Sequence, residues 1–312
     1  EFDAVQGLAK GDLAGVGLEL ASGPPLQPPL GGRGVKGGVQ EGVLVAGVVK
    51  GSPAEAAGVH VGDVLVTVDG EQVVGDKLDV AANLLRGEAG SGVRVEVKRG
   101  DGFLTFPIRR AEFKYEGVLS EVRWGVGQRP VGVVTIKVFS KGTAEDVRVA
   151  IGKVVSEGAS SVILDLRHNP GGFFPGGIDT ARLFLHADET IVSVVDRNSI
   201  ADSYSAIADG KYSEVPLVVA VDEKTASASE ILSAALKENG RAPLVGHTTF
   251  GKAKVQTLNQ LMDGSGVAVT TSLYKTPKGN DINGKGISVD VPSDCPYPGD
   301  VLSCIPPTGS LP

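Results

Sequence analysis

The chain of 312 residues carries 30 Lys and Arg against 37 Asp and Glu, which gives a formal net charge of −7 at pH 7. Hydrophobic residues make up 41% and charged residues 21%, the ordinary balance of a folded protein with a sizeable core. The acidic charge and the lack of a basic stripe argue against a nucleic-acid partner, and no apolar run approaches the roughly 20 residues needed to cross a bilayer.

The length and the start of the chain bear on its domain organisation. A chain of this length predicts two domains. It opens abruptly with Glu1-Phe2-Asp3 and shows no signal-peptide pattern, so we expect a mature or trimmed form from which any targeting segment has been removed. We interpret residues 1–12 as the remnant of a preceding segment.

The first third of the sequence consists of short apolar strands broken by glycines, from Leu13 to about Phe113. Alternating patterns predict strands at Val43 to Val49 and Asp63 to Val68, and a further strand at 93–98 closes the unit. A single apolar face predicts a helix at 77–85.

A short helix is expected between the first two of these strands. Ser52 is a good helix cap, Pro53 suits the first turn, Glu55 stands three residues after the cap, and Gly58 ends the helix. A Pro- and Gly-rich insertion at 22–38 is expected to form a mobile surface loop.

This order of elements, with the segment GSPAEAAGVHVGDVLVTVDGEQV, resembles a PDZ domain over residues 13–113. PDZ domains add an extended peptide to a sheet edge and hold its terminal carboxylate on backbone N–H groups. The resemblance implies a peptide site with amides offered by Gly15, Val16, Gly17 and Leu18, and a side-chain pocket lined by Val80 and Leu84. Taken alone, the stretch GVGLEL also fits an ordinary strand after a glycine turn.

Beyond Tyr115, strands alternate with helices, a pattern typical of an α/β sheet whose ligands bind at strand ends. The strand SSVILDLR is apolar at almost every position, so we expect both of its faces to be buried. The other expected elements are a strand at 130–140, helices at 142–158 and 177–185, a strand at 216–222, a helix at 227–239 and a strand at 242–247.

Two strand ends are chemically unusual. LDLRHNPGG turns through Asn169, Pro170, Gly171 and Gly172, and paired glycines let backbone amides point into a cleft, although such turns are common in loops. The stretch VDEKTASASE places three hydroxyls immediately before a helical pattern.

The hydroxyl cluster of Thr225, Ser227 and Ser229 allows two interpretations. Ser227 followed three positions later by Glu230 has the capping-box spacing, so a helix start alone explains it. The other interpretation is a catalytic serine, which needs a base to become a nucleophile.

The candidate bases are four histidines and one lysine. His60 is expected on the surface of the first domain, His186 follows an apolar helix, and His168 and His247 lie near strand ends without an evident Asp arrangement. Lysine has a pKa of about 10.4, and desolvation lowers such a pKa by several units. Lys252 follows an apolar strand, a context that would tuck its amine beside a helix start.

The segment TASASEILSAALKENGRAPLVGHTTFGKAKVQ resembles the catalytic core of the carboxyl-terminal processing peptidases, a family of PDZ-containing serine proteases with a Ser/Lys pair. The family nucleophile corresponds to Ser227, and the family lysine to Lys252, 25 positions later. A glutamine that orients the lysine corresponds to Gln256. VILDLRHNPGG and YKTPKGNDINGKGISVD match two further family motifs, so the resemblance runs from Leu13 to about Asp290.

The resemblance implies a fold and a mechanism. The fold is mixed α/β (α+β), a PDZ domain plus a crotonase-like ββα protease core at 114–292, followed by a Pro-rich tail at 293–312. Ser227 would attack the scissile carbonyl, and neutral Lys252 would take its proton. The backbone N–H groups of Ala228 and Gly172 would form the oxyanion hole, with Gly171 shaping the turn. No metal and no cofactor are implied.

The implied partner is a protein or peptide with an apolar C-terminus, including a membrane-embedded precursor. Within the family, the C-terminal tail and the segment NDING resemble the chloroplast-lumen branch, which trims the photosystem II reaction-centre protein precursor. The expected location is therefore the chloroplast thylakoid lumen, with the bacterial periplasm as the alternative. Ala253 and Val289 depart from the family's glycine and proline, and the helical segment that normally precedes the PDZ domain is nearly absent. Cys295 and Cys304 either form a disulfide or remain free thiols, and the oligomeric state is open.

Two other functions compete with a protease. One is a PDZ peptide-binding adaptor on an inactive hydrolase-like core, and the joint presence of Ser227, Lys252 and Gln256 counts against it. The other is a crotonase-type acyl-CoA enzyme, in which the PDZ segment would have no role.

Overall fold

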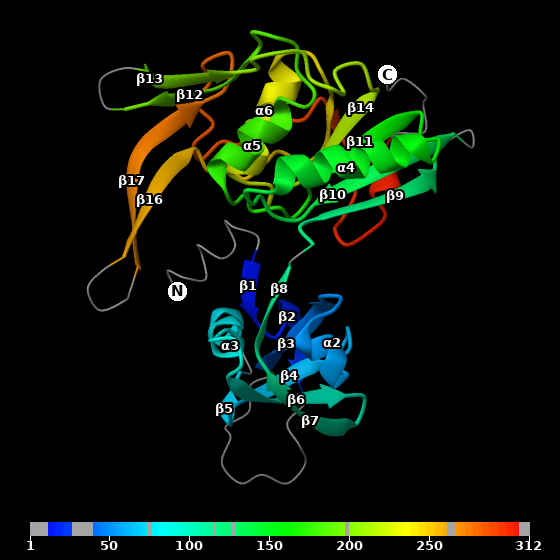
Figure 1. Ribbon diagram of the computed structural model, residues 1–312, viewed down its shortest axis with the longest axis vertical. Coiled ribbons are helices and arrows are strands. Elements are labelled where there is room, and N and C mark those ends of the chain that lie inside the picture. Colours follow the sequence, from blue (N-terminus) through cyan, green and yellow to red (C-terminus); the bar gives the residue numbers. More distant parts are fainter. Residues whose placement is uncertain are drawn as a thin grey trace. The chain divides into compact units, whose positions relative to one another are not determined.

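The computed structural model (Figure 1) describes residues 12–26, 40–73, 77–114, 116–125, 129–196, 200–260 and 266–305. The chain divides into two compact units, the first running from Asp12 to Glu116 and the second beginning at Gly117. No helix within the described ranges is long and apolar enough to cross a membrane.

The first unit is built on an antiparallel sheet with the strand order β2-β3-β4-β6-β7, in which β2 is an edge strand. Its apolar core contains fully buried Val45, Leu65, Val95 and Val97. The strands are β1 (Asp12–Gly15), β2 (Leu18–Leu26), β3 (Gln40–Val48), β4 (Val64–Val68), β5 (Glu71–Gln72), β6 (Gly92–Arg99), β7 (Gly102–Arg109) and β8 (Ala111–Lys114). β5 pairs with β4, and β1 pairs with β8.

Two helices complete the first unit, α2 (Pro53–Ala57) and α3 (Leu78–Leu85). Ser52 caps α2 because its side chain accepts from the Glu55 N–H at 3.3 Å, and Gly58 ends the helix at φ 88°, as the sequence predicts. The expected loop at 22–38 is partly wrong, since β2 continues to Leu26 and pairs with β3. The remainder of that insertion, from residue 27 onward, lies outside the described residues.

The second unit is organised around a sheet with the order β18-β15-β14-β11-β10-β9. All pairs in it are parallel except that of β9 with β10. Its strands are β9 (Val118–Trp124), β10 (Pro130–Ile136), β11 (Ser161–Asp165), β14 (Leu217–Val221), β15 (Leu244–Gly246) and β18 (Val291–Pro292).

Both faces of this sheet are covered, as the apolar strand patterns predict. On one face, Val134, Leu164 and Val219 pack in a core with the helices α4 (Thr143–Ser156), α5 (Phe174–Ala181) and α6 (Ala228–Glu238) (Figure 1). The alternate residues of the same strands pack against the C-terminal segment, including η2 (Val301–Cys304). Successive side chains of a strand point to opposite faces, which explains the continuous apolar runs.

A second sheet was not expected from the sequence. It is antiparallel with the order β13-β12-β17-β16, and β16 and β17 project as a long hairpin (Figure 1). Its strands are β12 (Thr190–Val195), β13 (Ile200–Ser205), β16 (Lys254–Gln260) and β17 (Gly266–Lys275).

Helix α5 begins three residues earlier than the sequence pattern predicts and ends at Ala181. Pro175 occupies its first turn, where the missing N–H costs no helical hydrogen bond. Residues 182–184 then form turns rather than continuing the helix. The glycines at 176 and 177 therefore lie inside the helix rather than at its start.

Candidate active site

The turn after β11 is fixed by one buried asparagine. Asn169 donates from Nδ2 to the Ile136 carbonyl at 2.6 Å, and its Oδ1 accepts from the Gly171 N–H at 2.9 Å. Gly171 and Gly172 then adopt φ values of 99° and 128°, a region that side chains other than glycine rarely occupy. The Asn-Pro-Gly-Gly sequence therefore encodes a defined backbone path rather than a loose loop.

This turn packs directly against the hydroxyl cluster. A Cβ placed on Gly171 would lie 2.7 Å from the Ser227 Cβ and 2.9 Å from the Ala228 nitrogen. The Ala226 N–H also donates to the Asn169 carbonyl at 3.0 Å. The structure thus brings together the two strand ends that the sequence singles out.

The three hydroxyls of the cluster have different surroundings. Thr225 is buried and donates to the Leu166 carbonyl at 2.8 Å, and Ser229 is buried and donates to the Asn169 carbonyl at 3.1 Å. Ser227 is only half-buried and adopts φ 57° and ψ −117° at the start of α6. Such a backbone conformation costs a non-glycine residue on the order of 1–3 kcal/mol and is often found at functional sites.

Glu230 links Ser227 to the segment that contains Lys252. This fully buried carboxylate accepts from the Ser227 N–H at 2.9 Å and from the Lys252 N–H at 2.8 Å. Its other oxygen accepts from the Gly251 N–H and the Thr249 hydroxyl, each at 2.6 Å. The capping-box spacing identifies Glu230 from the sequence, but the bonds to residues 249–252 carry no local signal.

Tyr274 forms a second link between the same two segments. Its hydroxyl donates toward the Lys252 carbonyl at 2.6 Å and the Ser227 carbonyl at 3.1 Å. Burial, followed by the charge of Glu230, raises the pKa of Tyr274 far above its ordinary value, so the hydroxyl remains a donor. Sequence reasoning assigns Tyr274 no role beyond marking a motif.

The side chains of Lys252 and Gln256 differ from the sequence-based expectation. Lys252 is exposed to solvent rather than tucked beside the helix start, so the expected shielding of its amine is wrong for this structure. Gln256 is also exposed, and its Nε2 lies 3.5 Å from the Thr270 hydroxyl on the neighbouring strand β17. The hydrogen bond to Glu230 fixes the main chain at Lys252, whereas the Lys252 side chain is exposed to solvent.

Two backbone donors remain unused at the junction of the turn and the helix. Within the described ranges, neither the Gly172 N–H nor the Ala228 N–H donates a hydrogen bond. Ala228 is the first residue of α6, where the partial positive charge of the helix start lies. Unpaired donors at this position suit an anionic oxygen.

In the first unit, the expected peptide-site residues lie at the end of β1, in the turn that follows it, at the start of β2 and on α3. Val16 is buried, and its carbonyl accepts from the Ala54 N–H at 2.8 Å. A Cβ on Gly17 would lie 2.2 Å from the Ser52 Cβ, so the turn requires glycine there. Val80 is 37% exposed, and Leu84 packs at the edge of the core.

His168 has an acidic partner that sequence reasoning missed. Its Nδ1 lies 2.5 Å from Oδ2 of Asp222, the residue directly after β14. Burial acts to raise the pKa of Asp222, but hydrogen bonds from the backbone and ring of His168 outweigh burial and hold that pKa below its ordinary value. His247 lies 3.8 Å from Asp294, and His60 is exposed as expected.

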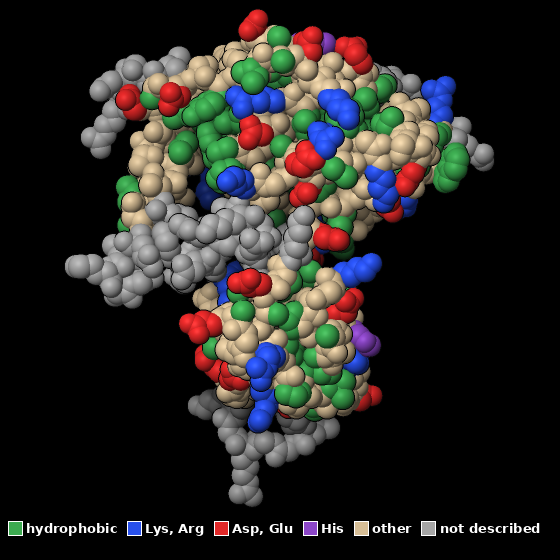
Figure 2. Space-filling model, viewed as in Figure 1, with side chains coloured by type: hydrophobic (Ala, Val, Ile, Leu, Met, Phe, Trp, Pro, Cys, Tyr) green, Lys and Arg blue, Asp and Glu red, His purple; other side chains and the backbone are tan. Residues whose placement is uncertain are grey.

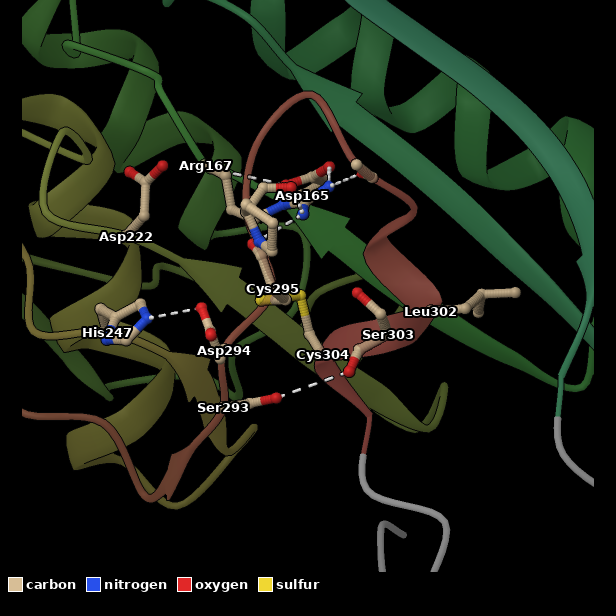
Figure 3. The surroundings of a disulfide bond; sticks show 12 residues. Asp165, Arg167, Asp222, His247, Ser293, Asp294, Cys295, Leu302, Ser303 and Cys304 are labelled. Carbon is tan, nitrogen blue, oxygen red and sulfur yellow. Dashed lines mark hydrogen bonds and ion pairs between the residues drawn. A yellow bond between two sulfur atoms is a disulfide. The ribbon is translucent and has the colours of Figure 1, made fainter.

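Arg167 connects the end of β11 to the C-terminal segment (Figure 3). Its buried guanidinium binds both oxygens of Asp165 at 2.9 and 2.8 Å and donates to the Cys295 and Gly299 carbonyls at 3.0 Å each. Cys295 and Cys304 form a disulfide, which decides between the two alternatives that the sequence leaves open.

On the face of the second unit seen in Figure 2, acidic and basic side chains are interspersed.

Two family models match the chain. One described as peptidase family S41 matches residues 130–293, and one described as a PDZ domain matches residues 44–99. Together they confirm the expected fold class, a PDZ domain joined to a mixed α/β peptidase core.

Similar proteins carry related names. The carboxyl-terminal-processing protease of Picosynechococcus sp. is 38% identical over 292 residues, covering 93% of this chain and 66% of that protein. The chloroplastic C-terminal processing peptidase of Tetradesmus obliquus is 36% identical over 296 residues, covering 91% of this chain and 61% of that protein. The chain thus spans 61–66% of the length of these curated relatives. A solved photosystem II D1 C-terminal processing protease is 36% identical with a TM-score of 0.57, covering 93% of this chain and 74% of that one.

Proposed function

The chain belongs to peptidase family S41, and we propose that it is a serine endopeptidase that cleaves proteins near their C-termini with Ser227 and Lys252. The observation that carries this proposal is the state of Ser227. It is the half-buried hydroxyl of the cluster, on a strained helix start that touches the Gly171 turn. Thr225 and Ser229 are instead engaged in buried hydrogen bonds.

In the proposed acylation step, the Ser227 Oγ attacks the scissile carbonyl carbon while the uncharged Lys252 amine takes its proton. The C–N bond then breaks, the amine proton passes to the leaving nitrogen, and the substrate remains as an ester on Ser227. Water attacks the ester in the second step and regenerates the hydroxyl.

Lys252 is proposed as the base because its main chain shares two partners with Ser227, the Glu230 carboxylate and the Tyr274 hydroxyl. The Lys252 side chain is exposed, and a bound peptide chain would shield it from water. Gln256 would orient the amine in the covered state.

The oxyanion is proposed to bind the N–H groups of Gly172 and Ala228. Both lack an acceptor among the described residues, and Gly171 packs against both Ser227 and the Ala228 nitrogen. Such preorganised donors commonly contribute about 10²–10³-fold to the rate of acyl transfer.

The PDZ domain is proposed to capture the substrate by its C-terminus. The edge position of β2 suits addition of an extended peptide strand, and the amides of Gly15, Val16, Gly17 and Leu18 would hold the carboxylate. Val80 and Leu84 on α3 would receive an apolar terminal side chain.

The proposed substrate is a protein precursor with an apolar C-terminus. The candidate is the precursor of the photosystem II reaction-centre protein D1, because a similar solved protein is named a photosystem II D1 C-terminal processing protease. We propose the chloroplast lumen as the location, with the bacterial periplasm as the alternative. The chloroplastic relatives support a chloroplast location, and the bacterial relatives support the alternative.

The test is product mass spectrometry of a peptide ending in the D1 precursor extension, incubated with wild-type protein and with Ser227→Ala. Cleavage by the wild type and its loss in Ser227→Ala are expected. Ser229→Ala is the matched control, because it removes a hydroxyl two residues away and should keep cleavage. Equal cleavage by wild type and Ser227→Ala would contradict the proposed nucleophile, and peptide binding without cleavage would favour an adaptor.

A further inference from the structure

His168 occupies an unusual position between β11 and the Asn169 turn. It adopts φ 59°, the left-handed region, which places both its N–H and its ring on the same carboxylate. The His168 N–H lies 3.0 Å from each oxygen of Asp222, and Nδ1 lies 2.5 Å from Oδ2. The side chain of Asp222 is only 7% exposed, against 31% for that of His168.

Asp222 also organises the approach to Ser227. One of its oxygens accepts from the N–H groups of Lys224 and Thr225, each at 3.0 Å, and from the Thr225 hydroxyl at 3.2 Å. One carboxylate therefore receives hydrogen bonds from the β11 turn and from the β14 loop. These are the two segments that carry the proposed oxyanion donors and the proposed nucleophile.

One face of the His168 ring is covered by the C-terminal segment. Tyr297 stacks on it with 4.6 Å between ring centroids and an interplanar angle of 21°. Tyr297 lies within the loop closed by the Cys295–Cys304 disulfide, and the Arg167 guanidinium lies 5.9 Å from its ring centroid. The imidazole thus contacts a buried carboxylate through Nδ1 and stacks on an aromatic ring through one face.

We propose that His168 and Asp222 form a positioning pair, in which the imidazole–carboxylate contact holds the Asn169–Gly172 turn in place against Ser227. This inference rests on the proposed peptidase function of the same site. Neither residue touches substrate in this scheme. They act through the main chain, by fixing where the Gly172 N–H lies when the oxyanion forms.

The side chain of His168 can be tested apart from its backbone conformation. Glycine and asparagine both adopt positive φ readily, so the variants His168→Gly and His168→Asn differ mainly in the side chain. The asparagine side-chain amide offers a donor to Asp222, whereas glycine keeps only the backbone N–H. His247→Asn is the matched control, because His247 also follows a strand of the same sheet but is exposed and 3.8 Å from its acid. Circular dichroism checks that each variant folds.

Two readouts decide the proposal. In His168→Gly, kcat should fall about tenfold to a hundredfold while KM changes by less than about threefold, the range expected for a misplaced catalytic group. His168→Asn and His247→Asn should keep kcat near the wild-type value. Amide hydrogen exchange of the peptide containing Asn169–Gly172 should be faster in His168→Gly, with unchanged exchange in α4.

Unchanged exchange in His168→Gly would overturn the proposal, and so would a kcat close to that of the wild type. An equal loss in His168→Asn would overturn the pairing with Asp222 and assign the effect to the stack on Tyr297. Failure of the proposed function is distinguishable, since it appears as equal cleavage by wild type and Ser227→Ala. The exchange measurement does not depend on cleavage.

Discussion

Replacement of Glu230 by glutamine tests whether one buried carboxylate holds the site together. Glu230 accepts four hydrogen bonds, two on each oxygen, and all four partners are donors. In Glu230→Gln the carboxamide keeps one oxygen, which can still accept from Thr249 and Gly251. The new NH₂ group then faces the N–H groups of Ser227 and Lys252, so two partly buried donors lose their acceptor.

An unsatisfied donor that is fully buried costs about 1–3 kcal/mol and a partly buried one costs less, so Glu230→Gln should lower the free energy of unfolding by at least about 1 kcal/mol. The kcat of the peptidase should fall as well, because Ser227 and Lys252 lose their shared anchor. Urea unfolding followed by far-ultraviolet circular dichroism measures the change in the free energy of unfolding.

The control is Glu157→Gln, an exposed carboxylate at the end of α4, where a change within about 0.5 kcal/mol is expected. A loss below about 1 kcal/mol in Glu230→Gln would refute the reasoning, because it would mean that the Ser227 and Lys252 N–H groups do not depend on the carboxylate for their hydrogen bonds.

Three further changes have defined outcomes. Gly171→Ala would place a Cβ 2.7 Å from the Ser227 Cβ at φ 99°, so it should cost at least about 1 kcal/mol of stability in urea unfolding and lower kcat. Tyr274→Phe removes the donor to two main-chain carbonyls of the site and should cost about 0.5–1.5 kcal/mol, with a fall in kcat measured on the same peptide. In the first unit, burial acts to raise the pKa of Asp63, but the Arg99 guanidinium and a backbone N–H outweigh it and lower that pKa. The lowered pKa of Asp63 contributes to the free energy of unfolding above the ordinary aspartate range, and this contribution is lost as the pH falls through the lowered pKa. On acidification, the free energy of unfolding should therefore fall less in Asp63→Asn than in the wild type.

Local signals predict the short helix and the buried strands well. Ser52, Pro53 and Gly58 place α2 because capping depends on neighbouring residues alone. The apolar run at β11 predicts burial on both faces of the sheet, because successive side chains of a strand point to opposite faces and nearly all of them are apolar here. Helix α5 is shifted because its pattern is weak and Pro175 starts it.

Contacts between distant segments could not be predicted from local patterns. In the antiparallel sheet of β12, β13, β16 and β17, strand β12 pairs with β17 although α6 separates them in the chain, so this pairing has no local signal. The contact of His168 with Asp222 spans 54 positions for the same reason. The exposure of Lys252 depends on what packs over it, which the spacing to Ser227 does not encode.

The central claim is that Ser227 forms the covalent intermediate, and peptide mapping of the trapped acyl-enzyme tests it most directly. Protein mixed with the D1-extension peptide and quenched in acid within milliseconds should carry the acyl group on the peptide that contains Ser227. Intact mass should show one acyl group per chain. An acyl group on Thr225 or Ser229, or cleavage with no acyl group on any of the three hydroxyls, would contradict the account.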